Sequence, residues 1–127
     1  MLACSFPALA GDCRTDKLAK AEALSAPPVA LVYKIHPGPI RVGAPFAVEV
    51  VACIAPDGKA PRRIRVDARM PAHGHGMNYR PSERKIGPGH ARYDGFVFHM
   101  PGRWALTFDV FTSAGRKRLT VNFDIKR

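Results

Sequence analysis

The chain has 127 residues and a formal net charge of +10, with 46% hydrophobic and 24% charged residues. This length allows a single domain and excludes a multidomain enzyme with a separate cofactor lobe. The composition is that of a folded globular chain and argues against intrinsic disorder. The 11 glycines and 12 prolines exceed the average share and favour many turns, hence β structure.

The first ten residues are predicted to be a truncated signal peptide. Residues 2–10 are apolar or small and end in Ala8-Leu-Ala10, the small-x-small pattern that precedes signal-peptidase cleavage. The stretch lacks a charged start, as expected if the start codon has been placed too far downstream. A second interpretation makes Cys4 the acylated cysteine of a lipoprotein box. Both predict an exported, periplasmic protein, and no apolar run of the mature chain reaches the roughly 20 residues that a transmembrane helix needs.

Two cysteines remain after such cleavage, Cys13 and Cys53, and an even number fits one disulfide in an oxidising compartment. The bridge would tie the N-terminal arm to a central strand. Closing a loop of about 40 residues contributes roughly 3–4 kcal/mol in the chain-entropy model. A thiolate metal site is disfavoured, because the two cysteines lack CxxC-type spacing.

Residues 11–28 are predicted to be an N-terminal arm, with either a short helix or an ordered arm over residues 14–25. Residues 14–25 are rich in helix formers, and Pro27 and Pro28 would stop a helix there. From residue 29 onward apolar residues recur at every second position, which is typical of strands with one face in a core. Strands are therefore expected at residues 29–35, 46–53 and 64–70.

A loop is expected over residues 71–89, followed by strands at residues 91–100, 103–111 and 116–126. Pro101 and Gly102 predict a turn that joins the first two of these strands into a hairpin. The pattern predicts an all-β fold, an immunoglobulin-like antiparallel β-sandwich of about seven strands over residues 29–127. A loop as long as residues 71–89 in a small sandwich is usually functional.

Histidine and methionine are concentrated in that loop and beside the predicted turn. Three of the four methionines and three of the five histidines lie in residues 70–77 and 98–104. Imidazole and thioether together suit copper, thioether favours Cu(I), and Mg²⁺ or Ca²⁺ would need carboxylates that these segments lack. Zinc more often takes Cys, or His with a carboxylate. The predicted copper ligands are two to four of His73, His75, Met77, His99 and Met100.

The expected geometry places these side chains at the edge of the core. In an extended segment His73, His75 and Met77 project to one side about 6.6 Å apart. The glycines between them would let the backbone bend, so that the side chains converge. His99 is expected to lie opposite Trp104 across the turn, and Trp104 is expected to shield the metal.

Four further residues are expected to support the site: Met70, Tyr79, Arg80 and Trp104. Met70 completes the inward face of its strand and fills the core, as methionine commonly does. Tyr79 and Arg80 are expected to hold the loop on the sheet. His36 and His90 lie in turns rich in Pro and Gly and are expected to be exposed to solvent.

Some of the predicted ligands also have a purely structural interpretation. Met100 could fill a gap in the core, and His99 could be a half-buried histidine held by hydrogen bonds. His73 and His75 are harder to explain in this way, since a pair separated by glycine on a loop packs against nothing. These two residues therefore carry most of the metal hypothesis.

Two segments of the chain resemble a known family. Residues 66–79 (VDARMPAHGHGMNY) and 95–104 (GFVFHMPGRW) resemble the YtkA-like family of exported β-sandwich domains. They are also similar to FixH-type proteins associated with copper and cytochrome oxidase assembly. The resemblance covers roughly residues 29–126 and implies an immunoglobulin-like periplasmic domain and, for several relatives, copper handling. The chain departs from FixH-type proteins in having no transmembrane helix beyond the predicted signal.

The function expected from these patterns is that of a periplasmic copper-binding protein, a chaperone or assembly factor that holds Cu(I). Its donor or acceptor would be another periplasmic or membrane protein. The alternative is a metal-free interaction or assembly module of the periplasm. An enzyme is not expected, because no GxSxG motif or paired carboxylates occur and Gly11, not histidine, would begin the mature chain. Nucleic-acid binding is not expected either, since the basic residues are dispersed and form no binding motif.

Overall fold

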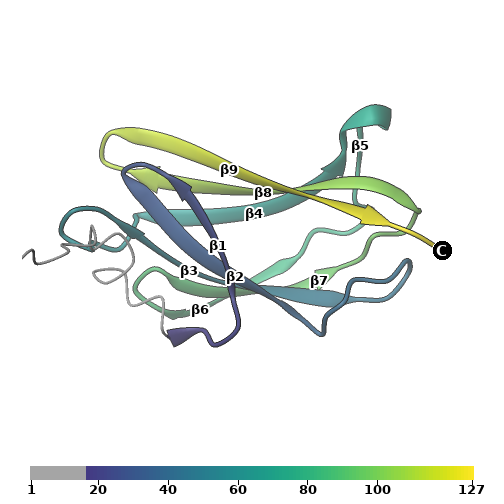
Figure 1. Ribbon diagram of the computed structural model, residues 1–127, viewed down its shortest axis with the longest axis horizontal. Helices are drawn as coiled ribbons and strands as arrows, with labels where there is room; N and C mark the ends of the chain where they lie inside the picture. The colour runs from purple at the N-terminus through teal and green to yellow at the C-terminus, as the bar shows by residue number, and fades with distance from the viewer. Residues whose placement is uncertain (1–16) are drawn as a thin grey trace, which may run out of the picture.

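The structure, a computed structural model, describes residues 17–127, and its regular elements are almost all strands. The strands form two antiparallel sheets, with the orders β1-β2-β3-β7-β6 and β5-β4-β8-β9, which lie face to face (Figure 1). The predicted all-β antiparallel sandwich is thus confirmed, with nine strands in the described chain instead of about seven. In chain order the elements are β1 (Glu22–Ala26), β2 (Val29–His36), β3 (Phe46–Ile54), β4 (Arg63–Met70), the 3-10 helix η3 (Pro71–His73), β5 (His75–Gly76), β6 (Ser82–Gly87), β7 (His90–Phe96), β8 (Gly102–Thr112) and β9 (Gly115–Ile125).

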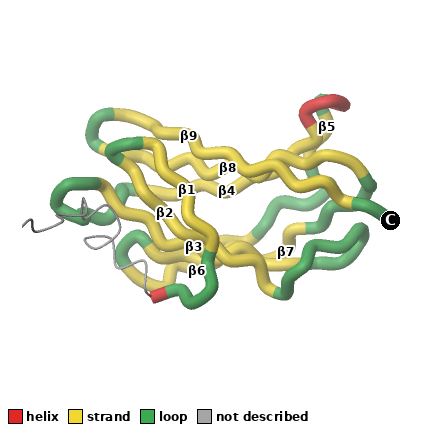
Figure 2. The backbone as a smooth tube through the Cα atoms, viewed as in Figure 1, coloured by secondary structure: helices red, strands yellow, loops and turns green. Residues whose placement is uncertain are grey.

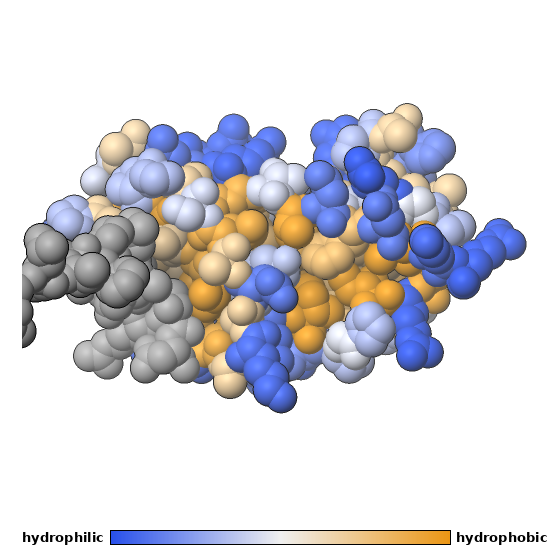
Figure 3. All heavy atoms as spheres, in the orientation of Figure 1, coloured by the Kyte–Doolittle hydropathy of each residue, from blue (hydrophilic) through white to orange (hydrophobic). Residues whose placement is uncertain are grey.

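The core lies between the sheets, because the long strands turn alternate apolar side chains inward. In β4 the even-numbered residues from Ile64 to Met70 are buried and the odd-numbered residues from Arg63 to Arg69 are exposed. Figure 3 shows a band of apolar side chains between the sheets on the flank of β1 and β9, with polar side chains on either side of it. The strands predicted at residues 29–35, 46–53, 64–70, 103–111 and 116–126 are confirmed to within one residue at each end.

The predicted N-terminal helix is wrong in the part of the arm that the structure describes. Residues Glu22–Ala26 form β1, which makes an antiparallel hairpin with β2. Leu24 and Ala26 pack against the main core from this strand. Helix propensity is a weak preference, and strand pairing together with this burial outweighs it.

The segment predicted as a long loop also contains regular structure. Residues 71–89 include η3, the two-residue β5 and the six-residue β6, which pairs with β7 at the edge of its sheet. None of the six residues of β6 is buried. An edge strand without a buried face has no apolar alternation, so the sequence carried no periodic signal for it.

The predicted hairpin between residues 91–100 and 103–111 is wrong. β7 ends at Phe96 and pairs with β3 and β6, whereas β8 lies in the other sheet between β4 and β9. Residues 97–101 therefore cross from one sheet to the other. Phe98 is buried within this crossover, and its carbonyl accepts a hydrogen bond from the N–H of Gly43 at 2.9 Å.

A tight contact fixes the turn between β6 and β7, and it gives a prediction on stability. Gly89 has a φ of +67°, and a Cβ there would collide with the carbonyl oxygen of Ala52, while Gly43 has a φ of +77° and open space around it. We expect Gly43→Ala to cost about 1 kcal/mol through its backbone conformation and Gly89→Ala to cost about 3 kcal/mol. Chemical denaturation of both variants checks this, and equal losses would contradict it.

Several expectations concern residues outside the described part of the chain. These are the signal peptide over residues 1–10, the lipoprotein cysteine Cys4 and the disulfide partner Cys13. Cys53 itself is buried on β3. Within residues 17–127, no helix has the length and apolarity to span a bilayer.

Candidate metal site

The segments rich in histidine and methionine meet at one end of the sandwich. The η3 turn contacts β8 there, and β5 pairs with the end of β4, as Figure 2 shows with η3 in red. The loop follows β4 directly, and the crossover leads into β8, the strand that pairs with β4. The pairing of these two strands therefore brings the two segments together.

The local backbone separates the two histidines of the loop. Residues Pro71–His73 form a 3-10 turn, and Gly74 has a left-handed φ of +57° with its N–H donating to the carbonyl of Pro71 at 3.3 Å. Only His75 and Gly76 are extended, and His75 pairs with Met70 of β4. The expectation that His73, His75 and Met77 share one side of an extended segment is therefore wrong. A glycine that adopts a left-handed conformation reverses the chain between His73 and His75.

The central feature of the site is the pair formed by His75 and His99. Their Nε2 atoms lie 3.0 Å apart, and their ring centroids are 5.0 Å apart with a tilt of 59°. His75 is exposed and His99 is half-buried. The distance is that of a hydrogen bond, in which one Nε2 donates its N–H and the other accepts it, with the direction set by the tautomers.

Aromatic packing fixes the ring of His99. Trp104 meets this ring edge-on at a centroid distance of 5.5 Å, and it stacks on Phe98 at 4.5 Å and an angle of 4°. The indole N–H of Trp104 donates to the carbonyl of Met100 at 3.0 Å. His99 Nδ1 is buried and has no hydrogen-bond partner among the described residues. The expected proximity of His99 and Trp104 is thus confirmed, although it arises in a crossover and not in a hairpin.

The other predicted ligands occupy different environments. His73 is exposed on η3 and has no hydrogen bond or ring contact with any described residue. Met77 is partly buried and packs against the core, while Met100 is 36% exposed. Among residues 17–127, no three His, Cys, Asp or Glu side chains converge on a common point. The described chain therefore offers two imidazoles for an ion, and any further protein ligand there would have to be a different donor, such as a thioether.

The supporting residues also divide into two groups. Met70 is buried in the core, as expected, and Trp104 is fully buried beside His99. Tyr79 is 69% exposed, so the expectation that it holds the loop on the sheet is wrong. Arg80 is exposed as well, and both residues line a groove beside β4.

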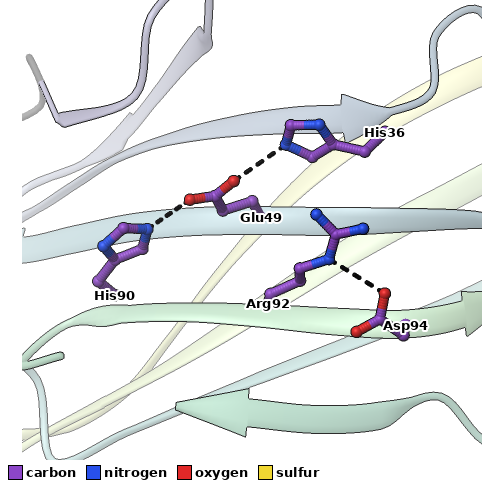
Figure 4. Close-up of polar contacts among 5 residues, drawn as sticks. All are labelled: His36, Glu49, His90, Arg92 and Asp94. Carbon is purple, nitrogen blue, oxygen red and sulfur yellow. Dashed lines mark hydrogen bonds and ion pairs between the residues drawn. The ribbon is translucent and has the colours of Figure 1, made fainter. Parts of the chain in front are cut away.

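The sequence interpretation missed a second cluster, on the outer face of the other sheet. The Nε2–H groups of His36 and His90 donate to the two carboxylate oxygens of Glu49, at 2.9 and 2.5 Å respectively (Figure 4). Both histidines are less than one third exposed, so the expectation that they are solvent-exposed is wrong. Glu49 is the only charged residue of β3, and a lone charge in an apolar strand was the sequence signal that could have pointed to this cluster. Its two histidine partners depend on the strand register, which the sequence does not show.

This cluster predicts how stability depends on pH. Burial alone raises the pKa of the Glu49 carboxyl, but the hydrogen bonds from His90 and His36 outweigh burial and lower this pKa. A carboxyl with a lowered pKa in the folded state contributes stability above its unfolded pKa, near 4.5, and loses it as the pH falls through the folded value. We expect Glu49→Gln to be less stable than the wild type at pH 6, with the difference shrinking below about pH 4. Melting curves across this range measure it, and a constant difference would contradict the assignment.

No protein-family model, curated protein or solved structure matches this chain. The site is therefore interpreted from its own geometry.

Proposed function

We propose that this protein binds copper, expected as Cu(I), through His75 and His99, and that it acts as a copper chaperone or assembly factor. The observation that carries this proposal is the pair of Nε2 atoms 3.0 Å apart at the end of the sandwich. Two imidazole nitrogens that share one ion at about 2.0–2.1 Å each, the distance for zinc, lie at most about 4.2 Å apart. The observed separation falls within that limit.

The chemistry of the neighbouring donors supports copper over other metals. Met77 and Met100 each lie within two residues of one of these histidines, and thioether sulfur favours Cu(I). No carboxylate occurs in residues 70–77 or 98–104, which disfavours hard cations such as Mg²⁺ and Ca²⁺. Bound copper would be either cargo or a resident ion. The chain would hold it beside the buried, stacked rings of Trp104 and Phe98.

The ring of His99 is oriented differently from that of an ordinary metal-bound histidine. Such a ring usually donates its second N–H to a carboxylate or carbonyl, which orients it. His99 Nδ1 has no such partner among the described residues, and the contacts with Trp104 take over the orienting role. His75 is exposed and is not held by aromatic packing of this kind. One fixed ring and one exposed ring suit a site that exchanges its ion with a partner, which would be another periplasmic or membrane protein.

The resemblance to YtkA-like domains points in the same direction, and it carries the proposal that the protein is exported to the periplasm. The alternative function is a metal-free interaction module, in which the two histidines share only a proton. Copper content separates the two functions.

The decisive experiment is a metal titration of the full chain. We expect one Cu(I) per chain to be retained after desalting and to resist a colorimetric Cu(I) chelator, and zinc should not displace it. Failure to retain stoichiometric copper would overturn the proposal and favour the interaction module.

The disulfide between Cys13 and Cys53 stays a prediction from the sequence. If it forms, the intact mass of the exported protein lies two hydrogen atoms, about 2 Da, below that of the reduced protein. Reduction is expected to lower stability by roughly 3 kcal/mol. Two titratable thiols in the native protein would contradict the bridge.

A further inference from the structure

A long groove runs along the flank of the sandwich opposite to β1 and β9. It has a volume of about 860 Å³, and its walls are β4 on one side and the segment from Gly76 to Glu83 on the other. β4 and β6 are the neighbouring margins of the two sheets on this flank, because β5 covers only the end of β4. The groove therefore follows the open seam between the sheets.

The wall formed by β4 is the free edge of a strand. β5 pairs with Arg69 and Met70 only, so no described strand covers residues 63–68 on this side. Every residue from Arg63 to Arg69 lines the groove, whether its side chain points inward or outward. A groove on one face of a strand would be lined by every second residue. This groove is lined by consecutive residues of β4, so it runs along the backbone edge of the strand.

Four arginines line this groove: Arg63, Arg65, Arg69 and Arg80. None of them forms an ion pair with another described residue, and the acidic lining residues are two, Asp67 and Glu83. The lining thus has an excess of positive charge with no partner in the described chain.

Three arginines outside the groove, Arg92, Arg103 and Arg118, are paired with carboxylates. Arg103 bonds to Asp124 at 2.9 Å, and Arg118 bonds to Asp109 at 2.7 and 3.1 Å. Asp109 is also the cross-strand neighbour of Arg65, but both of its oxygens are taken by Arg118. Other arginines, such as Arg116, are also unpaired among the described residues, so the groove is distinguished by the four unpaired arginines that gather in one lining.

We propose that the groove binds an extended acidic segment of a partner protein, which pairs with the free edge of β4 as an added strand. No described strand pairs with residues 63–68 on this side, and the addition of a strand is a common mode of peptide recognition. The Ile64 carbonyl already accepts from the Tyr93 hydroxyl and the Ala68 N–H donates to the Asp67 side chain, so the partner segment would use the remaining backbone groups or displace these bonds. Neighbouring side chains on one face of a sheet lie opposite each other, so acidic residues would alternate along the segment to face Arg63 and Arg65. The position opposite Asp67 would not be acidic. This proposal does not depend on copper binding.

The lining favours a peptide over the other anionic partners. Single-stranded nucleic acids bind to grooves in which several aromatic rings stack on the bases. Tyr79 is the only exposed aromatic residue of this lining, since Tyr93 is buried and its hydroxyl donates to the carbonyl of Ile64 at 2.6 Å. Charged side chains also protect edge strands from self-association. That role would need no partner, and the test below distinguishes it.

The test uses a labelled peptide of about eight residues, the length that spans the free edge. In it glutamate alternates with threonine except at the position opposite Asp67, which is also threonine, and the comparison peptide has the same composition with the glutamates in one block. Fluorescence anisotropy at low ionic strength measures the binding of both to the full chain. We expect the alternating peptide to bind at least about tenfold more tightly, because only its charges match the spacing along one strand face.

Two charge reversals locate the binding site. Arg65→Glu and Arg80→Glu, on opposite walls of the groove, are each expected to weaken binding of the alternating peptide by about tenfold. Arg116→Glu is the matched control, since Arg116 is exposed on β9, lies outside the groove and forms no ion pair with a described residue. It makes the same change in net charge and is expected to have a much smaller effect. All three positions are exposed, so melting curves should stay close to that of the wild type.

Four results would overturn the proposal. Equal affinity for the two peptides would show that the alternating peptide binds only by general electrostatic attraction. Equal losses from Arg65→Glu and Arg116→Glu would place binding outside the groove. Tighter binding of an oligothymidylate than of the peptide would assign the groove to nucleic acid. Self-association of Arg65→Glu without any peptide binding by the wild type would show that the arginines only protect the edge.

Discussion

Replacement of His75 by alanine is expected to lower the Cu(I) affinity of the full chain by at least about 100-fold, the upper end of the loss caused by removing an outer-shell partner of a metal ligand. His99→Ala is expected to have an effect of the same size, because the two Nε2 atoms face each other at 3.0 Å and removal of either breaks the pair. A competition titration with a Cu(I) chelator measures both affinities.

His73→Ala is the matched control for the same loop. It removes an imidazole that is exposed and lacks contacts with described residues, so the affinity should remain that of the wild type. Met77→Ala is expected to weaken Cu(I) more than Cu(II), since thioether prefers Cu(I) whereas imidazole binds both. If the double variant His75→Ala/His99→Ala still binds one Cu(I) with wild-type affinity, the pair is not the copper site.

The largest effect on stability is expected at Trp104. Its side chain is fully buried, stacks on Phe98 and donates to the carbonyl of Met100. Trp104→Ala should therefore destabilise the protein by about 3–5 kcal/mol, because it leaves a large cavity and an unpaired carbonyl. For a chain of this size the melting temperature should fall by roughly 10–20 °C.

Two further variants serve as comparisons for the stability loss of Trp104→Ala. Trp104→Phe keeps an aromatic ring near Phe98 but removes the N–H donor, so its loss should be clearly smaller than that of the alanine variant. Tyr79→Ala removes an aromatic side chain that is 69% exposed and should change stability by no more than about 0.5 kcal/mol. Equal losses for Trp104→Ala and Tyr79→Ala would contradict the packing described here.

The fold could be predicted wherever burial on one face leaves a period of two in the sequence. β4 and β9 belong to this group, because buried residues alternate with more exposed ones along their length. β6 could not be predicted, since it has no buried residue, and β1 was misassigned because its residues favour helices until β2 pairs with them. Pro101-Gly102 marks a change of direction in both a hairpin and a crossover, so it could not distinguish between them.

The candidate site was predictable in part for a similar reason. The density of His and Met singled out two segments that the fold brings together at His75 and His99. The orientation of His73 depends on the left-handed Gly74, and the partners of Glu49 depend on strand register. Composition and spacing contain neither kind of information, because both arise from the backbone path in three dimensions.

The position of Trp104 has an optical consequence. The chain contains one tryptophan, so fluorescence excited beyond the absorption of tyrosine originates from this single ring. That ring is shielded from water, lies parallel to Phe98 and packs at 75° to the ring of His99. The emission spectrum of the unlabelled protein is therefore a local signal from the crossover between the two sheets. Trp104 is therefore an intrinsic fluorescence probe beside the histidine pair at which the ion is proposed to bind.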